Sequence, residues 1–340
     1  MTIRAKKGRA LTPWFVSLIG LLALTGCVAV PSAERADRPI AVTAFYSTPE
    51  GVPLVDVSLN GAGPYPLVID TAASRTLITK KVAAELSLTL SEGRTARVFS
   101  LNSVERHRTA TVSSLAIGAA TNRDVSIIVV DEFTAASGAK GVLGVDILAR
   151  YGLFMDPVSK ALSLYQPNVR PDIVNDEWRE TLLYPTTFGV GSGRLYSLNA
   201  NVAGRPFDAL LDTGAEVTVG NIALVDYLTM RRIRRTNQAT RIKGADGPAA
   251  QAYAVDYRDF RSGRINWGRG VFFASEARIF EELGYRNRPF ALIGFDVLGR
   301  RPFAIDFQGG VLRVGPTSKT DPLGDSPDAS SAVSSAASAP

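Results

Sequence analysis

The chain has 340 residues, 46% hydrophobic and 21% charged, which is enough apolar chain for a body with a sizeable buried core. Its 38 basic and 32 acidic residues give a net charge of +6, but four basic residues stand in an N-terminal leader, leaving 34 against 32. So small an excess argues against a charge-driven nucleic-acid binder, and a single Cys and a single His exclude a disulfide scaffold and a zinc cluster.

The first 27 residues form an export leader. A basic start precedes an apolar segment at 11–24 that is short for a membrane span, and Leu-Thr-Gly then leads into Cys27 as in a bacterial lipobox. We predict cleavage before Cys27 and lipidation of its thiol. The product would be anchored at the bacterial envelope, and Val28 after the Cys favours the periplasmic side of the outer membrane. An ordinary cleaved signal or a single N-terminal anchor is the alternative.

The remaining chain divides by composition and by internal similarity. We expect a tether at 28–44, a first lobe at 45–167, a connection at 168–188 and a second lobe at 189–316. The tail at 317–340 is dominated by Ser, Ala, Pro and Asp and cannot bury enough apolar surface to order itself.

Within the lobes, short strands outnumber helices. Alternation predicts a strand at 52–59, and continuous apolar runs predict buried strands at 127–130 and 270–274. Short helices are expected at 80–86 and 222–230.

Two apolar strands each end in an acid-bearing turn, and each follows a hairpin signal. The first turn is Asp70-Thr71-Ala72-Ala73. The second is Asp212-Thr213-Gly214-Ala215. A lone carboxylate beside apolar residues loses its hydration, so the repetition predicts two carboxyl groups brought to one place.

The repetition continues downstream of the two turns. An apolar segment at 141–148, containing Gly144, is echoed at 291–298, containing Gly294. The chain is therefore a tandem duplication, which has to be recognised before a fold is assigned.

Asp-Thr-Gly-Ala after an apolar strand, followed by an apolar-apolar-Gly segment, resembles the retropepsin and pepsin aspartic proteases. The resemblance covers about 45–316 and implies an all-β, bilobal fold in which each lobe supplies one Asp-Thr turn. The segments containing Gly144 and Gly294 would pack around these turns as ψ-shaped motifs. Because one chain supplies both acids, a monomer suffices to build the site.

The resemblance implies a catalytic pair, Asp70 and Asp212, with Thr71 and Thr213 bonding across the lobes. Ala72 departs from the family, which has Gly there, while Gly214 matches. Ala73 and Ala215 stand where many pepsins have Ser or Thr, whose hydroxyl stabilises the carboxylate. Without that donor the pair should titrate higher, and activity should lie at weakly acidic or neutral pH.

Two carboxyl groups within hydrogen-bond reach share one proton, because like charges so close repel. The ionised acid then takes a proton from water while the protonated acid polarises a carbonyl, which hydrolyses an amide without a covalent intermediate. The chemistry needs no metal and no organic cofactor.

A candidate hairpin lies between each acid turn and its later Gly. The first spans about 94–112, with a polar tip at Asn102 and Ser103, and the second spans about 240–255, with Gly244 and Asp246 in its turn. They resemble the flaps that close over a peptide in the family; plain surface hairpins are the alternative.

Other polar residues have simpler interpretations. His107, in the first hairpin, is expected to be a solvated loop residue, which leaves a Ser-His-Asp triad without a base. The basic run at 231–235 is expected to be a solvated helix end or loop. Four duplicated acids are expected to be structural turn residues: Asp146, Asp156, Asp296 and Asp306.

The sequence thus predicts an aspartic endopeptidase that acts on peptide or protein substrates and needs no nucleic acid. A cleft that binds a peptide or an envelope partner without cleaving it is the main alternative, and Ala72 is the feature in its favour. A structural envelope lipoprotein is a third reading. Both alternatives leave the paired acids and threonines without a purpose.

Overall fold

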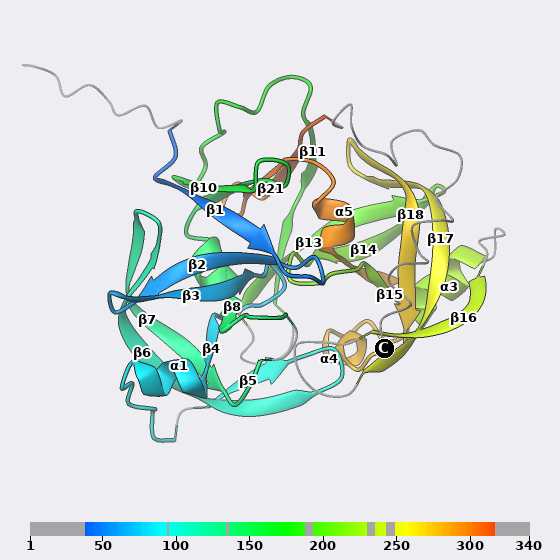
Figure 1. Ribbon diagram of the computed structural model, residues 1–340. Helices are drawn as coiled ribbons and strands as arrows, with labels where there is room; N and C mark the ends of the chain where they lie inside the picture. The colour runs from blue at the N-terminus through cyan, green and yellow to red at the C-terminus, as the bar shows by residue number, and fades with distance from the viewer. Residues whose placement is uncertain are drawn as a thin grey trace, which may run out of the picture. The chain divides into compact units, whose positions relative to one another are not determined.

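The computed structural model describes residues 38–93, 95–133, 136–187, 193–229, 235–242 and 249–316, all within the compact unit Arg35–Pro340. Cys27 and the leader, the tail at 317–340 and the basic residues 231–234 lie outside them. Strands dominate the described residues, and they form two sheets (Figure 1). The all-β fold expected from the resemblance is confirmed.

The first lobe contains ten of the described strands and two short helices. They are β1 (Ala41–Ser47), β2 (Pro53–Leu59), β3 (Ala62–Ile69), β4 (Leu77–Thr79), α1 (Lys80–Glu85), β5 (Thr95–Phe99), β6 (Val104–Ile117), β7 (Ala120–Val130), β8 (Gly141–Leu143), α2 (Val145–Leu148), β9 (Gly152–Asp156) and β10 (Ala161–Tyr165).

After two connecting strands, the second lobe repeats the order of elements from β2 to β10 and adds one short helix. The connecting strands and the elements of the second lobe follow here in chain order. They are β11 (Arg179–Leu182), β12 (Tyr184–Thr187), β13 (Arg194–Val202), β14 (Arg205–Leu211), β15 (Val219–Asn221), α3 (Ile222–Thr229), β16 (Arg235–Ile242), β17 (Ala250–Ser262), β18 (Ile265–Ser275), α4 (Ile279–Glu282), β19 (Phe290–Ile293), α5 (Phe295–Leu298), β20 (Phe303–Asp306) and β21 (Val311–Val314).

Both acid-bearing strands are reached through the predicted tight hairpins. Asn60 and Gly61 join β2 to β3 with φ of 51° and 77°, and Ala203 and Gly204 join β13 to β14 with φ of 51° and 80°. Positive φ at both central residues matches the twist of the flanking strands. The hairpins therefore deliver the ends of β3 and β14 at equivalent places in the two lobes.

Six strands join the lobes in one antiparallel series, in the order β1, β10, β9, β20, β21 and β11. Its centre is the pair β9 and β20, where Leu153 lies opposite Ile305 and Met155 opposite Phe303. All four side chains are buried, and Phe45 of β1 packs edge-on against Phe295 of α5 at 6.3 Å between ring centroids. This apolar burial resists separation of the lobes.

The predicted end of the tether is wrong, and the predicted connection contains strands. The expected tether at 28–44 overlaps β1, whose first residues, 41–44, pair with β10. The expected connection at 168–188 contains β11, which pairs with β21, and β12, which pairs with β13. The partners of β1 at 41–44 and of β11 are distant in sequence, so local composition did not reveal these strands.

The prediction for His107 is also wrong. This residue lies within β6, opposite Ala96 of β5, and its side chain is 9% exposed. Its Nε2 is 3.4 Å from a carboxylate oxygen of Glu105. The hairpin strands are longer than expected and carry His107 under neighbouring side chains. The helices expected at 80–86 and 222–230 are present as α1 and α3, each one residue shorter.

Candidate active site

The two catalytic candidates stand at equivalent points of the two lobes. The N–H of Asp70, directly after β3, donates to the carbonyl of Leu143 at 3.1 Å, and β3 runs parallel to β8. The N–H of Asp212, directly after β14, donates to the carbonyl of Ile293 at 3.0 Å, and β14 runs parallel to β19. Each acid is thus tied to the strand that leads into the predicted ψ-motif glycine.

Gly144 and Gly294 are required by close approach of backbone rather than by their φ angles. A Cβ on Gly144 would lie 2.6 Å from the carbonyl carbon of Arg75, and one on Gly294 would lie 2.5 Å from that of Val217. Each glycine N–H donates to a threonine hydroxyl, Thr76 at 3.1 Å and Thr218 at 3.0 Å. A side chain at either position would push the acid turn away from its supporting strand.

Thr71 and Thr213 hold the two turns together by reciprocal hydrogen bonds. The Thr71 hydroxyl donates to the carbonyl of Leu211 at 2.8 Å and accepts from the Thr213 N–H at 3.1 Å. The Thr213 hydroxyl donates to the carbonyl of Ile69 at 2.6 Å and accepts from the Thr71 N–H at 3.1 Å. Both threonines are buried, so these bonds fix the spacing of the loops that carry the acids.

The carboxyl groups of Asp70 and Asp212 interact electrostatically in a partly dehydrated site. Asp212 is 9% exposed and Asp70 is half-buried. Burial raises the pKa of Asp70 to about 6, although hydrogen bonds from the N–H groups of Ala72 and Ala73 oppose the rise. Burial, together with the charge of Asp70, raises the pKa of Asp212 well above its ordinary value. One proton on the pair therefore persists into the weakly acidic range.

Asp146 and Asp296 support the turns from behind. Asp146 accepts from the N–H and hydroxyl of Thr76 at 2.8 and 2.7 Å, and Asp296 accepts from the Thr218 hydroxyl at 2.7 Å. These threonines are the acceptors for the ψ-motif glycines, so the acids orient the ψ-motifs. Burial raises the pKa of Asp296 to about 6.

Asp156 and Asp306 hold tight turns away from the cleft. The N–H of Val158 donates to Asp156 at 2.9 Å, and the N–H of Gly309 donates to Asp306 at 2.9 Å. These bonds stabilise the two-strand turns β9–β10 and β20–β21. All four duplicated acids thus have contacts that suit the predicted structural role.

Both dyad carboxyls line a cavity of about 620 Å³ between the lobes. Apolar side chains form one wall in each lobe, and the strand registers make the two walls equivalent. In the first lobe Leu77 lies opposite Ile128 and Val142; in the second Val219 lies opposite Phe273 and Leu292. The sequence analysis missed these wall residues, although aligning the two repeats on their acids would have paired them.

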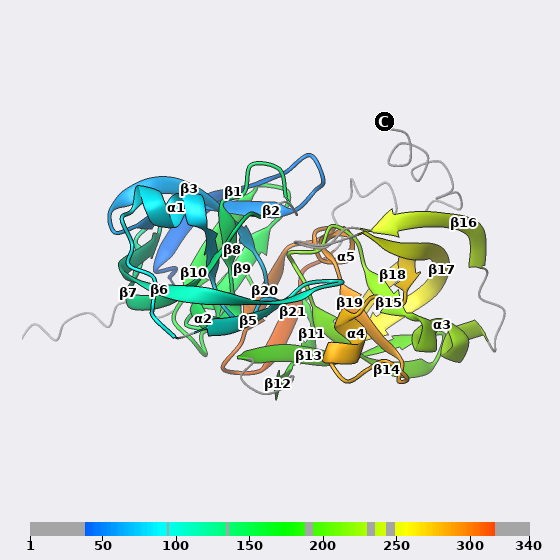
Figure 2. The same cartoon turned by 90° about the horizontal axis from the view of Figure 1, so that it is seen from below.

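The first hairpin, β5–β6, reaches the opposite lobe. Its tip closes through the Ser100 N–H, which donates to the carbonyl of Ser103 at 3.0 Å. The carbonyl of Leu101 then accepts from the N–H of Ile279 at 3.0 Å, and the Asn102 amide oxygen accepts from the N–H of Arg278 at 3.4 Å. Figures 1 and 2 both place β5 beside α4.

An ion pair also joins this hairpin to the second lobe. Arg97 of β5 is 3.3 Å from a carboxylate oxygen of Glu282 of α4, and both side chains line the cavity. Local sequence carries no signal for this contact, because 185 positions separate the partners. The second predicted hairpin is present as β16–β17, but its turn with Gly244 and Asp246 lies outside the described residues.

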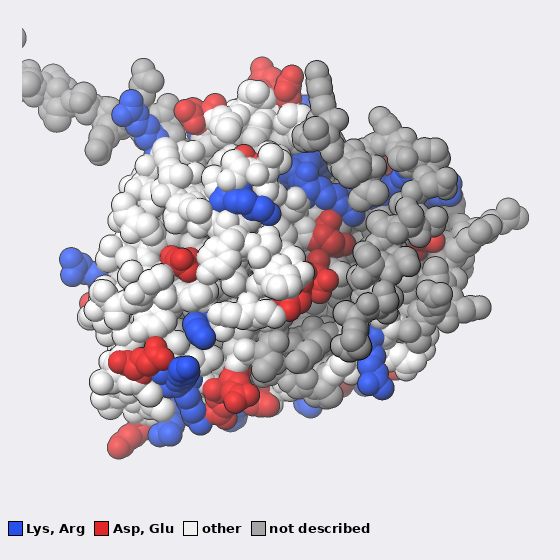
Figure 3. All heavy atoms as spheres, in the orientation of Figure 1, with Lys and Arg blue, Asp and Glu red and all other residues white. Residues whose placement is uncertain are grey.

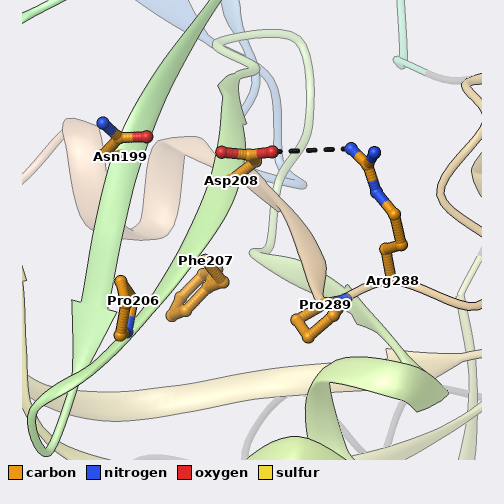
Figure 4. A pocket seen from close by; sticks show the side chains of 6 residues that line it. All are labelled: Asn199, Pro206, Phe207, Asp208, Arg288 and Pro289. Carbon is orange, nitrogen blue, oxygen red and sulfur yellow. Dashed lines mark ion pairs between the residues drawn. The ribbon is translucent and has the colours of Figure 1, made fainter.

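A second, shallower pocket of about 310 Å³ lies near the start of β14. Its charged groups face one another: Arg288 is 3.7 Å from Asp208, which also accepts from the Tyr285 hydroxyl at 3.0 Å (Figure 4). The pocket is several residues from the acid turn. We assign no function to it.

Metal and surface features do not change the assignment of the site. Within the described residues, no three His, Cys, Asp or Glu side chains cluster as metal ligands, and no helix there is long and apolar enough to cross a membrane. On the face drawn in Figure 3, basic and acidic side chains are interspersed.

Each repeat delivers one Asp-Thr turn to a shared cavity. This arrangement is typical of the two-lobed acid proteases, which is the structural class of the protein. A family model described as aspartyl protease matches residues 55–147 and 198–294, which together exceed half of the chain. The protein therefore belongs to the aspartyl protease family. No curated protein matches the chain.

Proposed function

We propose that the protein is an endopeptidase that hydrolyses peptide bonds with a water molecule activated by Asp70 and Asp212. The observation that carries the proposal is the convergence of both carboxyls in one cavity, clamped by the reciprocal bonds of Thr71 and Thr213. Crowding two buried acids is costly, and a cleft that only binds peptides gains nothing from it.

The pair performs general acid–base catalysis while it holds a single proton. The ionised carboxyl takes a proton from the water, and the protonated carboxyl donates to the carbonyl oxygen of the substrate. Since burial raises the pKa of Asp70 to about 6 and that of Asp212 well above its ordinary value, the singly protonated state extends to weakly acidic pH. An activity optimum below about pH 3.5, near unperturbed carboxyl values, contradicts this part of the proposal.

The cavity walls favour a substrate with apolar side chains on both sides of the cleaved bond. Val68, Leu77 and Val142 form a surface in the first lobe, and Leu210, Val219 and Leu292 form one in the second. Burying an apolar side chain against either wall contributes roughly 1.5–3 kcal/mol.

We also propose that the protein acts at the bacterial envelope, anchored through lipid on Cys27. The support is the leader and its lipobox in the sequence. Labelling cells with a radioactive or alkyne-bearing fatty acid and comparing a Cys27→Ser variant tests it. Label incorporation that survives the substitution refutes lipidation at this thiol.

A second candidate function is peptide binding without cleavage, and Ala72 is the observation that favours it. Gly214 occupies the equivalent position of the other turn, so only the first turn carries a methyl group at the position directly after Asp-Thr. This candidate keeps the cleft and its apolar walls but assigns no chemistry to the two acids.

The deciding experiment is digestion of a diverse peptide library by the purified protein between pH 3 and 8, beside Asp212→Asn. The matched control is Asp208→Asn, which removes an acid from the same strand, β14, outside the cleft. Hydrolysis requires cleavage by the parent and the control, and its loss in Asp212→Asn. Binding of library peptides without cleavage at any pH supports the second candidate.

A further inference from the structure

The two dyad carboxyls are held unequally. Asp70 Oδ1 accepts from the N–H of Ala72 at 2.8 Å and from that of Ala73 at 2.9 Å. The N–H groups of Gly214 and Ala215 also act on the Asp212 carboxyl and lower its pKa, but within the described residues neither makes a bond as well formed as the two to Asp70. The Ala215 N–H instead donates to the backbone carbonyl of Asp212, at 3.3 Å. Two donors to one oxygen favour the ionised form of Asp70 over that of Asp212.

The residue after each Asp-Thr explains why the turns differ. A Cβ on Gly214 would lie 2.5 Å from Asp70 Cγ and 2.6 Å from Asp70 Oδ2, closer than the 3.0 Å that real Cβ atoms respect. The second turn therefore presses against the Asp70 carboxyl only because it has no side chain. Neither Gly214 nor Ala72 has a positive φ, so space rather than backbone conformation decides the matter.

The reciprocal threonine bonds relate the two turns to each other. Residue 72 is therefore placed toward Asp212 as Gly214 is placed toward Asp70. A Cβ is present at residue 72, so the Asp212 carboxyl must lie further from this turn than Asp70 lies from Gly214. Asp212 is accordingly the more buried acid, at 9% exposure.

Building on the proposed hydrolysis, we propose that the Ala72 methyl group makes the dyad unequal, so that the shared proton resides on Asp212 and Asp70 is the base. Ala72 is then a positioning residue that assigns the two chemical roles, rather than the mark of a lost activity.

The charged groups around the cavity do not reverse this order. Arg75 pairs with Asp146 at 3.6 Å, Arg97 pairs with Glu282, and Glu50 accepts from Ser137. Glu216 is exposed, and Arg241 lies on β16 at the rim. The one charge that shifts the pKa of Asp212 is that of Asp70, and it raises it.

The catalytic cycle follows with its protons balanced. Asp70 takes a proton from water as the oxygen bonds to the substrate carbonyl carbon, and the carbonyl oxygen takes the proton of Asp212. In the resulting gem-diol, Asp70 gives its proton to the nitrogen as the C–N bond breaks. One hydroxyl of the gem-diol returns a proton to Asp212, which restores the starting state.

The test is a carboxyl titration by NMR of the full chain carrying ¹³C-labelled aspartate. Asp70→Asn and Asp212→Asn assign the two signals. We expect the Asp212 carboxyl signal to shift mainly in the higher-pH step of the pair and that of Asp70 in the lower one. The opposite order, or equal shifts of both signals in both steps, overturns the proposal.

Ala72→Gly is the informative variant, and Ala215→Gly is its matched control, since it removes a methyl group from the opposite turn. We expect Ala72→Gly to lower the higher step by about 0.5–1 pH unit, and the control to lower it less. Equal effects of the two variants refute the role of Ala72. Thermal melts exclude misfolding. The titration needs no turnover, so a protein that cleaves nothing refutes the proposed function while these shifts still decide the inference.

Discussion

The two Asp-Thr turns have matching backbone supports and unequal carboxyl groups. Each acid N–H bonds to the strand before its ψ-motif glycine, and each threonine bonds across to the other loop. They differ at the position after Asp-Thr, which is Ala72 in the first turn and Gly214 in the second. They differ also in that Asp70 accepts two short backbone hydrogen bonds, whereas Asp212 is more buried. Duplication thus preserved the scaffold of the site, whereas a single methyl group separates the chemistry of its halves.

The largest effects are expected from the acids themselves. Asp70→Asn and Asp212→Asn should each lower kcat/KM by at least 10²–10⁴-fold, the usual contribution of a general acid or base. We expect more residual activity in Asp212→Asn than in Asp70→Asn. An amide can still donate a hydrogen bond in the place of Asp212, but it cannot act as the base in the place of Asp70. Rate measurements on one fluorogenic peptide decide it, and greater residual activity in Asp70→Asn contradicts the assigned roles.

The next effect concerns the residue that differs between the turns. Gly214→Ala should abolish activity and lower the free energy of unfolding by about 1–3 kcal/mol, because its Cβ meets the Asp70 carboxyl at 2.5 Å. Ala72→Gly should leave the protein folded. Denaturant unfolding of both variants measures the contrast, which disappears if the two stabilities change equally.

The threonine pair tests the symmetric part of the comparison. Thr71→Val and Thr213→Val each remove a buried hydroxyl that bonds a carbonyl and an N–H of the other lobe. Leaving these partners unsatisfied should cost about 1–3 kcal/mol in either variant. Matching losses in denaturant midpoint support equivalent roles, and a loss confined to one variant shows that the clamp is one-sided.

The pH dependence of the free energy of unfolding distinguishes Asp296 from Asp146, the two acids that support the turns. Burial raises the pKa of Asp296 to about 6, above its value of about 3.9 in an unfolded chain. The folded state therefore holds the extra proton, and stability falls as pH rises from about 4 through 6. Asp296→Asn should reduce this fall by about 1–3 kcal/mol.

Asp146→Asn is the comparison for that profile. Burial also raises the pKa of Asp146, but the hydrogen bonds from Thr76 and the charge of Arg75 oppose the rise. Its substitution should therefore flatten the profile less. Equal flattening by the two variants shows that Thr76 and Arg75 do not weaken the rise at Asp146 relative to that at Asp296. Unfolding in urea from pH 4 to 7 supplies both curves.

The smallest effect is expected where the lobes meet through the first hairpin. Arg97 and Glu282 are partly exposed, so their ion pair should contribute at most about 1 kcal/mol and weaken with salt. Glu282→Gln should raise KM for peptides less than tenfold at low salt and less at high salt. A salt-independent change points instead to a lost packing contact.

Much of the site could be predicted from the sequence because duplication repeats chemistry at a fixed spacing. Asp70, Asp212 and their threonines were found from the repeated apolar-apolar-Asp-Thr pattern, and the all-β fold followed from the resemblance that this pattern carries. Hairpin turns and the short helices α1 and α3 were also found, since Gly and Asn turns and local periodicity are local signals.

Edge strands and burial were decided by distant partners. The segment containing β11 resembles a linker by composition, and it becomes a strand by pairing with β21 at the other end of the second lobe. His107 is polar and sits between charged neighbours, yet the long hairpin buries it. Propensity depends on neighbours in the sequence, whereas edge pairing and burial depend on neighbours in space.

By itself the sequence determined which residues form the dyad and that the chain contains two copies of one lobe. It also marked Ala72 as a departure from the family pattern, which on the sequence alone favoured a cleft that binds without cleaving. Only the tertiary structure decided that the departure separates two otherwise equivalent acids. The physical reason is distance: a Cβ on one turn meets the carboxyl of the other, and the two turns lie more than 140 residues apart in the chain.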